Sequence, residues 1–159
     1  MTLMKFSNHL IVLFSIIFGF WLDGYFNQFT AKYFIELNFG FLIFTYWIFA
    51  MPEKIQSLAP MLYGLAVDLL FSNFLGFNML FFVATSYIIH LYVFRFRIFS
   101  YFQLSVFFSG SSTFYTACMY LLFSPNNYSY FLLILSFVVN AVLWVGVYLM
   151  MRAFRRKIF

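Results

Sequence analysis

The chain has 159 residues, of which 65% are hydrophobic and only 8% are charged, and its mean hydropathy is +0.96. A soluble domain carries roughly 25% charged residues, and a chain of this length cannot hide so much apolar surface in its own core. Composition therefore excludes a soluble protein and predicts an integral membrane protein. The net charge of +5 does not indicate nucleic-acid binding, because the basic residues lie at segment ends rather than in an aromatic-interleaved stripe.

Six apolar segments follow one another along the chain, and each is predicted to be a membrane helix: 8–22, 34–51, 57–71, 74–94, 101–123 and 130–151. A full span needs about 20 apolar residues, a length that the last three segments reach. The first segment is expected to remain as a helix, because no small-x-small cleavage site follows it. The third is short and contains Pro60 and Asp68, so it is either a short span or a re-entrant piece. We expect an all-α polytopic protein with one transmembrane domain, 1–159.

The basic residues predict the orientation of these helices, because cytoplasmic loops are enriched in Lys and Arg. With six spans, eight basic residues share the side of both termini, and only Lys32 lies on the other side. Five spans, without segment 57–71, give seven against two, so the preference for six is small. We expect cytoplasmic N- and C-termini, with the basic tail from Arg152 as an anchor that also attracts anionic lipid.

Residues that could catalyse a reaction or bind a metal do not gather in the sequence. The lysines lie at segment ends, His9 and His90 are far apart, and a single cysteine, Cys118, allows neither an intrachain disulfide nor a Cys metal site. The stretch 110–113, Gly-Ser-Ser-Thr, lacks the second glycine of a G-x-S-G protease motif, and its small residues suit close helix packing. We expect no enzyme activity, no cofactor and no metal.

Asp68 is the one carboxylate placed deep in an apolar segment. A charged side chain at the bilayer centre costs about 2.5–3.5 kcal/mol, so it tends to have a partner or to reach water. Gly64 shares its helix face, where a small residue allows another helix to pass closely. Two interpretations remain open: Asp68 is hydrated near the outer interface, or it accepts backbone N–H bonds from the start of the next helix, near residues 75–78.

Two stretches, 46–97 and 138–157, resemble the rod shape-determining protein MreD family. Eight residues of the first stretch match the family in order and spacing: Tyr46, Trp47, Pro52, Gly64, Asp68, Leu69, Leu75 and Gly76. In the second stretch the matching residues are Asn140, Leu143, Trp144 and the basic tail from Arg152. Residues 1–45 and 101–137 agree only in hydropathy. The chain departs from some relatives at Asn78, where they carry a basic residue, and at Val145, where they carry proline.

The resemblance implies a non-enzymatic subunit of the bacterial cell-elongation (rod-shape) machinery, which directs peptidoglycan synthesis, in the cytoplasmic (inner) membrane. It implies binding to the single-span scaffold MreC, and work beside MreB, RodA and a class B penicillin-binding transpeptidase, surrounded by membrane lipid and without nucleic acid. It also implies a fold resembling the substrate-binding subunits of vitamin importers, an analogy that is not evidence of transport.

Six residues are the candidates for partner-binding or structural roles: Trp47, Gly64, Asp68, Gly76, Asn140 and Trp144. The tryptophans have interface-belt anchoring as an alternative, and the glycines have packing within the chain. The alternative function is a small-ligand binding or transport membrane subunit, in which Asp68, Asn78 and Asn140 would line a pocket.

Overall fold

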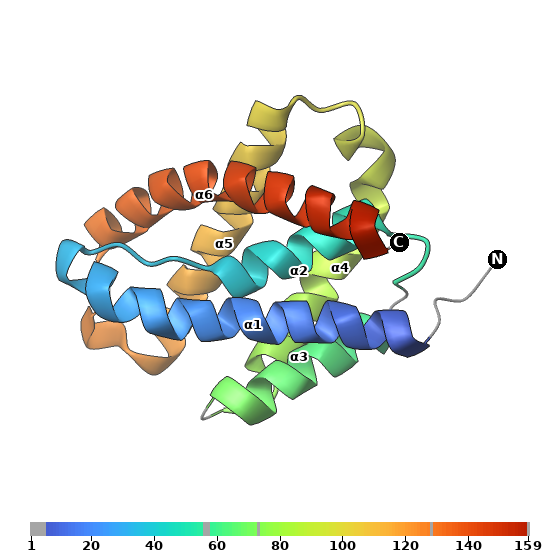
Figure 1. Cartoon of the computed structure of the whole chain (residues 1–159). Coiled ribbons are helices and arrows are strands. Elements are labelled where there is room, and N and C mark those ends of the chain that lie inside the picture. Colours follow the sequence, from blue (N-terminus) through green and yellow to red (C-terminus); the bar gives the residue numbers. More distant parts are fainter. Residues whose placement is uncertain (1–5, 56–57, 73, 128, 159) are drawn as a thin grey trace.

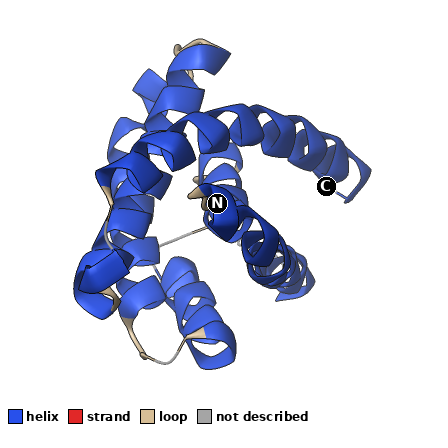
Figure 2. Ribbon diagram, turned by 90° about the vertical axis from the view of Figure 1, so that its left-hand side faces the viewer, coloured by secondary structure: helices blue, strands red, loops and turns tan. Residues whose placement is uncertain are grey.

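The computed structural model describes residues 6–55, 58–72, 74–127 and 129–158. These residues form six α-helices and the segments that connect them (Figure 1): α1 (Phe6–Thr30), α2 (Phe39–Ala50), α3 (Leu58–Phe71), α4 (Phe77–Phe96), α5 (Tyr101–Phe123) and α6 (Tyr130–Ile158). Two 3-10 turns, η1 (Ala31–Tyr33) and η2 (Pro125–Asn127), follow α1 and α5. The described part of the chain contains no strand (Figure 2), which confirms the predicted all-α class.

Four of the helices, α1, α4, α5 and α6, are long and apolar enough to cross a membrane. The other two, α2 with 12 residues and α3 with 14, are apolar but shorter. At 1.5 Å per residue they extend roughly 18 and 21 Å, less than the roughly 30 Å of a bilayer core. The structure thus bears out an α-helical membrane protein, and four of the six predicted spans have the length of a full crossing.

The helix boundaries differ from the predicted segments at four main places. Residues 74–76, predicted to begin the fourth helix, form a turn, and α4 begins at Phe77. Helix α1 continues to Thr30 instead of ending near residue 22, and α6 continues to Ile158 instead of ending at 151. Residues 34–38, predicted to begin the second helix, are not helical, and α2 begins at Phe39. The polar residues that lengthen α1 face the non-helical segment and bond to it, as described below. Ser57, the predicted start of the third helix, and Lys5 lie outside the described residues.

Helix α2 forms the centre of the molecule. Residues 40–48 are all buried, and α1, α4, α5 and α6 each contact the helix. Such a helix is apolar on every side, because it has no face toward the surroundings. Aromatic rings fill the core beside it: Phe44 stacks on Phe82 with 3.8 Å between ring centroids. Helix α3 packs along α4, and α5 packs along α6. The short connections within these two pairs therefore join neighbouring antiparallel helices.

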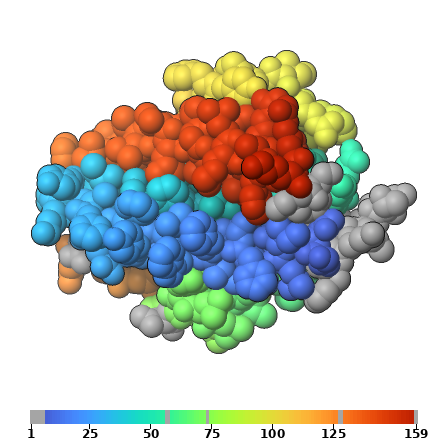
Figure 3. All heavy atoms as spheres, in the orientation of Figure 1, coloured from blue at the N-terminus to red at the C-terminus, as the bar shows by residue number. Residues whose placement is uncertain are grey.

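The outer face of α1 is apolar and aromatic. Exposed aromatic rings recur along α1: Phe14, Phe18, Trp21, Tyr25 and Phe29. Figure 3 shows the outer face of α1 at the surface of the molecule, uncovered by the other helices. In water such a patch would be costly, whereas lipid accommodates it. Helix α1 begins and α6 ends at the same end of the molecule (Figure 1), which also holds the basic residues of the α2–α3 turn and of the ends of α4 and α6. Lys32, in η1, is remote from this cluster in the sequence.

Candidate functional site

A buried carboxylate joins α3 to α4. Asp68 is fully buried, and its Oδ2 atom accepts hydrogen bonds from the backbone N–H groups of Gly76 (2.9 Å) and Met79 (3.1 Å). Its Oδ1 atom accepts from the backbone N–H (3.1 Å) and the side-chain amide (2.9 Å) of Asn78. Carboxylates are favoured at helix N-termini, where backbone N–H groups have no partner within the helix. The predicted bonding to the start of the next helix is confirmed, and the interpretation of Asp68 as hydrated is wrong.

Two glycines make this junction possible. A Cβ atom on Gly64 would lie 2.4 Å from the Cα atom of Met79, so α3 and α4 touch there with no room for a side chain. Gly76, in the turn before α4, has φ +101°, a backbone conformation that residues with a side chain rarely adopt. The three predicted residues Gly64, Asp68 and Gly76 therefore come together as one structural unit.

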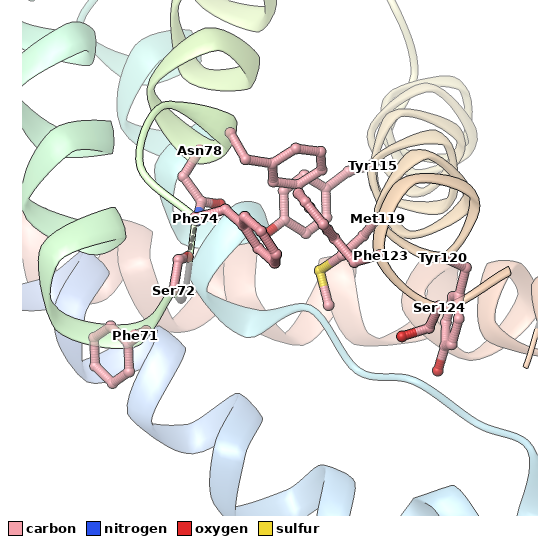
Figure 4. Close-up of a pocket in the computed structure, with 10 residues that line it drawn as sticks. Phe71, Ser72, Phe74, Asn78, Tyr115, Met119, Tyr120, Phe123 and Ser124 are labelled. Carbon is pink, nitrogen blue, oxygen red and sulfur yellow. Dashed lines mark hydrogen bonds between the residues drawn. The ribbon is translucent and has the colours of Figure 1, made fainter.

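Asn78 extends this unit to α5. Its side-chain amide donates to Ser72 Oγ (3.0 Å) as well as to Asp68, and its Oδ1 atom accepts from the hydroxyl of Tyr115 (2.7 Å). Figure 4 shows Asn78, Ser72 and Tyr115 together at the side of a hollow. The side-chain partner of Asp68 is thus a neutral amide and not a basic group.

A second polar network supports the non-helical segment before α2. Asp23 of α1 accepts hydrogen bonds from the backbone N–H groups of Phe39 (2.5 Å) and Gly40 (3.0 Å), the first residues of α2. Asn27, one turn further along α1, accepts from the backbone N–H of Leu37 (2.8 Å) and donates to its carbonyl (3.0 Å). Asp23 follows directly after the first predicted segment, 8–22, but in the structure it lies inside α1 and caps the start of α2.

Helices α5 and α6 complete this second network. Asn140 accepts from the backbone N–H of Asn38 (3.1 Å) and donates to the carbonyl of Glu36 (2.7 Å), while Ser136 Oγ accepts from the backbone N–H of Glu36 (2.8 Å). The Asn38 side chain donates to hydroxyls on α5, those of Ser112 (2.8 Å) and Thr116 (2.9 Å). Non-helical backbone among membrane helices needs such partners, because lipid offers none.

The two predicted tryptophans lie in the core. Trp47 is fully buried, and its Nε1 atom donates to Ser15 Oγ (2.8 Å). Trp144 is 1% exposed and stacks on Phe108 and Tyr148, with ring centroids 5.3 and 5.2 Å away. Interface-belt anchoring, the alternative for both, is wrong, because neither ring reaches the surface of the chain.

Sequence reasoning missed the residues of the second network on α1: Asp23 and Asn27. Their spacing of four residues places them on one helix face, which was a usable signal. Both residues lie beyond the apolar run 8–22, so apolarity alone does not place them on the first helix. Glu36 and Tyr120 were also missed, and in the structure the Tyr120 hydroxyl donates to the Glu36 carboxylate.

A cavity of about 290 Å³ lies between the two networks, and a hollow of about 380 Å³ adjoins it at α5 (Figure 4). Of the polar residues expected to line a pocket, Asn78 lines the cavity, whereas Asp68 and Asn140 do not. Asp23 and Glu36 border it, but both oxygens of Asp23 already accept backbone N–H bonds. No group of three or more His, Cys, Asp or Glu residues is placed to hold a metal ion within the described ranges.

Comparison of the chain with protein-family models, with curated proteins and with solved structures gives no significant match.

Proposed function

We propose that this protein is a non-enzymatic membrane subunit of the bacterial cell-elongation complex, as its resemblance to the MreD family implies. One observation carries the proposal: the residues of the resemblance are those that determine how the helices meet. Gly64, Asp68 and Gly76 join α3 to α4, and Asn140 holds the segment before α2. A family whose members share these residues would share this helix arrangement.

The roles of the polar residues favour a scaffold over a catalyst. Asp68 and Asp23 are used as acceptors for backbone N–H groups at two helix starts. Asn140 also bonds backbone on both sides of Leu37: it accepts from the N–H group of Asn38 and donates to the carbonyl of Glu36. These groups build the fold, and each would have to break its bonds to take part in a reaction.

The mechanism of such a subunit is positional. Exposed apolar side chains cover α1, α3, α4 and the α3–α4 turn. Two residues of the resemblance are among them: Leu69 in α3 is 66% exposed, and Leu75 in the turn is 69% exposed. A single membrane helix of a partner such as MreC could pack on this surface, through dispersion contacts that do not require a buried charge. By binding one conformation of the partner more tightly, the subunit would raise the population of that conformation. MreB, RodA and the class B transpeptidase would then be held through the larger complex.

A small-ligand binding or transport subunit is the second candidate, because a cavity of about 290 Å³, with both apolar and polar residues in its lining, lies among the helices. Ligand sites combine an apolar wall with a few free polar groups. Here Asn78 and Asp23, which border the cavity, are already bonded within the chain. These polar groups are therefore not free to bind a ligand, which weakens the case for a ligand site in the cavity.

The test is to purify the protein from its native host in mild detergent and to identify co-purifying proteins by mass spectrometry. The scaffold function predicts recovery of a MreC-like protein, with the RodA–transpeptidase pair, and loss of rod shape when the protein is depleted. Recovery of an importer's ATPase and coupling subunits without a MreC-like protein would contradict it and favour the second candidate.

A further inference from the structure

A basic hollow of about 370 Å³ lies at the end of the molecule where α2, α4 and α6 end. Its lining comes from three segments that are far apart in the sequence: Ala50, Met51, Pro52, Glu53, Lys54, Arg97, Arg155 and Arg156. The lining includes four basic residues and one carboxylate, Glu53, which gives it a formal charge of +3. The hollow therefore attracts an anion.

The backbone wall of the hollow is well ordered by hydrogen bonds. The carbonyl of Met51 accepts from the N–H groups of Lys54 (3.1 Å) and Ile55 (3.2 Å), which closes the turn after α2. A ring nitrogen of His90 lies 2.8 Å from the carbonyl of Pro52 and ties this turn to α4. A wall that is already in place costs little conformational entropy when a ligand binds.

The arginines of the hollow are not all needed by the fold. Arg155 donates to the carbonyl of Ala50 (3.0 Å), the last residue of α2, and so acts as a helix C-cap. Arg97 and Arg156 are exposed, and no hydrogen bond or ion pair joins either side chain to another residue in the described part of the chain. Two guanidinium groups thus remain available beside a third.

The basic residues outside the hollow provide a contrast. Arg95 lies over the ring of Tyr92, 5.6 Å from its centroid, and Arg152 donates to the hydroxyl of Tyr101. Lys157 is exposed and does not line the hollow. Basic residues at a helix end thus need not line the hollow, and these three do not. Arg97, Arg155 and Arg156, in contrast, line it together.

We infer that this hollow binds the phosphate group of an anionic phospholipid. Guanidinium groups pair with phosphate oxygens in bidentate geometry, and basic pockets between membrane helices bind anionic headgroups. The hollow lies at the ends of α4 and α6, which places it at the membrane surface. Exposed Phe94 and Ile98 on either side of Arg97, and Phe154 next to Arg155, offer apolar surface for the lipid chains. This inference does not depend on a role in cell elongation.

Native mass spectrometry of the full chain, titrated with phosphatidylglycerol or with phosphatidylcholine, tests the inference. We expect one phosphatidylglycerol to remain bound, and the double variant Arg97→Gln/Arg156→Gln to bind it about 30-fold more weakly. That factor corresponds to about 1 kcal/mol for each arginine, at tenfold per 1.4 kcal/mol. The control Arg95→Gln/Lys157→Gln removes the same charge outside the hollow and should bind like the unaltered protein.

Three results would overturn the inference. Equal weakening by the two double variants would indicate diffuse charge attraction, and equal affinity for phosphatidylcholine would exclude selection for an anionic lipid. Displacement of the lipid by glycerol 3-phosphate at similar concentration would identify a soluble phosphate as the ligand. Circular dichroism checks that each variant is folded. If the double variant is not, Arg97→Gln and Arg156→Gln are compared singly, each with an expected loss of about fivefold.

Discussion

Two aspartates, Asp23 and Asp68, perform the same task at two places in the chain. Each lies on one helix and accepts backbone N–H bonds at the start of the next helix. The residues at the N-cap positions, Asn38 for α2 and Gly76 for α4, make no capping bond with a side chain. The aspartates thus replace the local caps, and they also link consecutive helices, which a local cap cannot do.

Replacing Asp68 by Asn tests this role at the residue scale. The carboxylate accepts four N–H bonds, and in asparagine an NH2 donor replaces one of its two oxygens, so bonds at one of the two positions would be lost. We expect the free energy of unfolding to fall by about 1–3 kcal/mol, measured as a lower thermal midpoint in detergent. Glu53→Gln, at an exposed carboxylate, is the control. Equal midpoints for the two variants would show that the Asp68 charge does not stabilise the junction.

Whole helices are positioned by contacts of their backbones. Helix α3 has only 14 residues, yet it packs closely along α4, because Gly64 lets the two backbones meet. Without water there is little hydrophobic force between membrane helices, so close van der Waals contact supplies much of their attraction. The short helix α3 therefore depends on this crossing more than a long helix would.

Two glycine-to-alanine variants test the crossing at the scale of the element. Gly64→Ala would place a methyl group 2.4 Å from backbone of α4, and we expect overpacking to lower the free energy of unfolding by roughly 1–3 kcal/mol. Gly146→Ala, in α6, meets nothing within 4 Å and should be neutral or stabilising by up to about 1 kcal/mol. Thermal melting of both variants side by side is the measurement. The close-contact argument fails if Gly64→Ala is as stable as Gly146→Ala.

The molecule as a whole separates its charges. Most basic residues lie at the end where α1 begins and α6 ends, while the two polar networks lie around the starts of α2 and α4. Such a separation orients a membrane protein, because basic residues are retained on the cytoplasmic side. The orientation further depends on whether α3, which is short for a span, crosses the bilayer.

Cysteine labelling tests this topology in a Cys118→Ser background. Phe74, exposed in the α3–α4 turn, and Glu53, exposed in the α2–α3 turn, flank α3. If α3 crosses, Phe74→Cys should react with a membrane-impermeant maleimide in intact cells, and Glu53→Cys should react only after permeabilisation. Labelling of both positions under the same condition would mean that α3 re-enters on one side, and would reduce the number of spans to five.

Some of this architecture is determined by the sequence itself. Composition alone specifies a membrane protein, because no core of 159 residues could bury so many apolar side chains, and the length of the apolar segments predicts helices. The role of Asp68 was also predictable, since its partners follow within 11 residues and a short turn brings them back to it. Hydrogen bonds between residues so close in the sequence can be predicted without knowing how the rest of the chain packs.

Other features were decided only by the tertiary structure. The loss of helix at 34–38 depends on bonds to Asn140 and Ser136, which lie about 100 residues away in the sequence. The basic hollow likewise forms because Lys54, Arg97 and Arg155 are brought to one end by packing around α2. A polar residue in a single sequence shows that it needs a partner, but only the packed helices bring that partner within hydrogen-bonding distance.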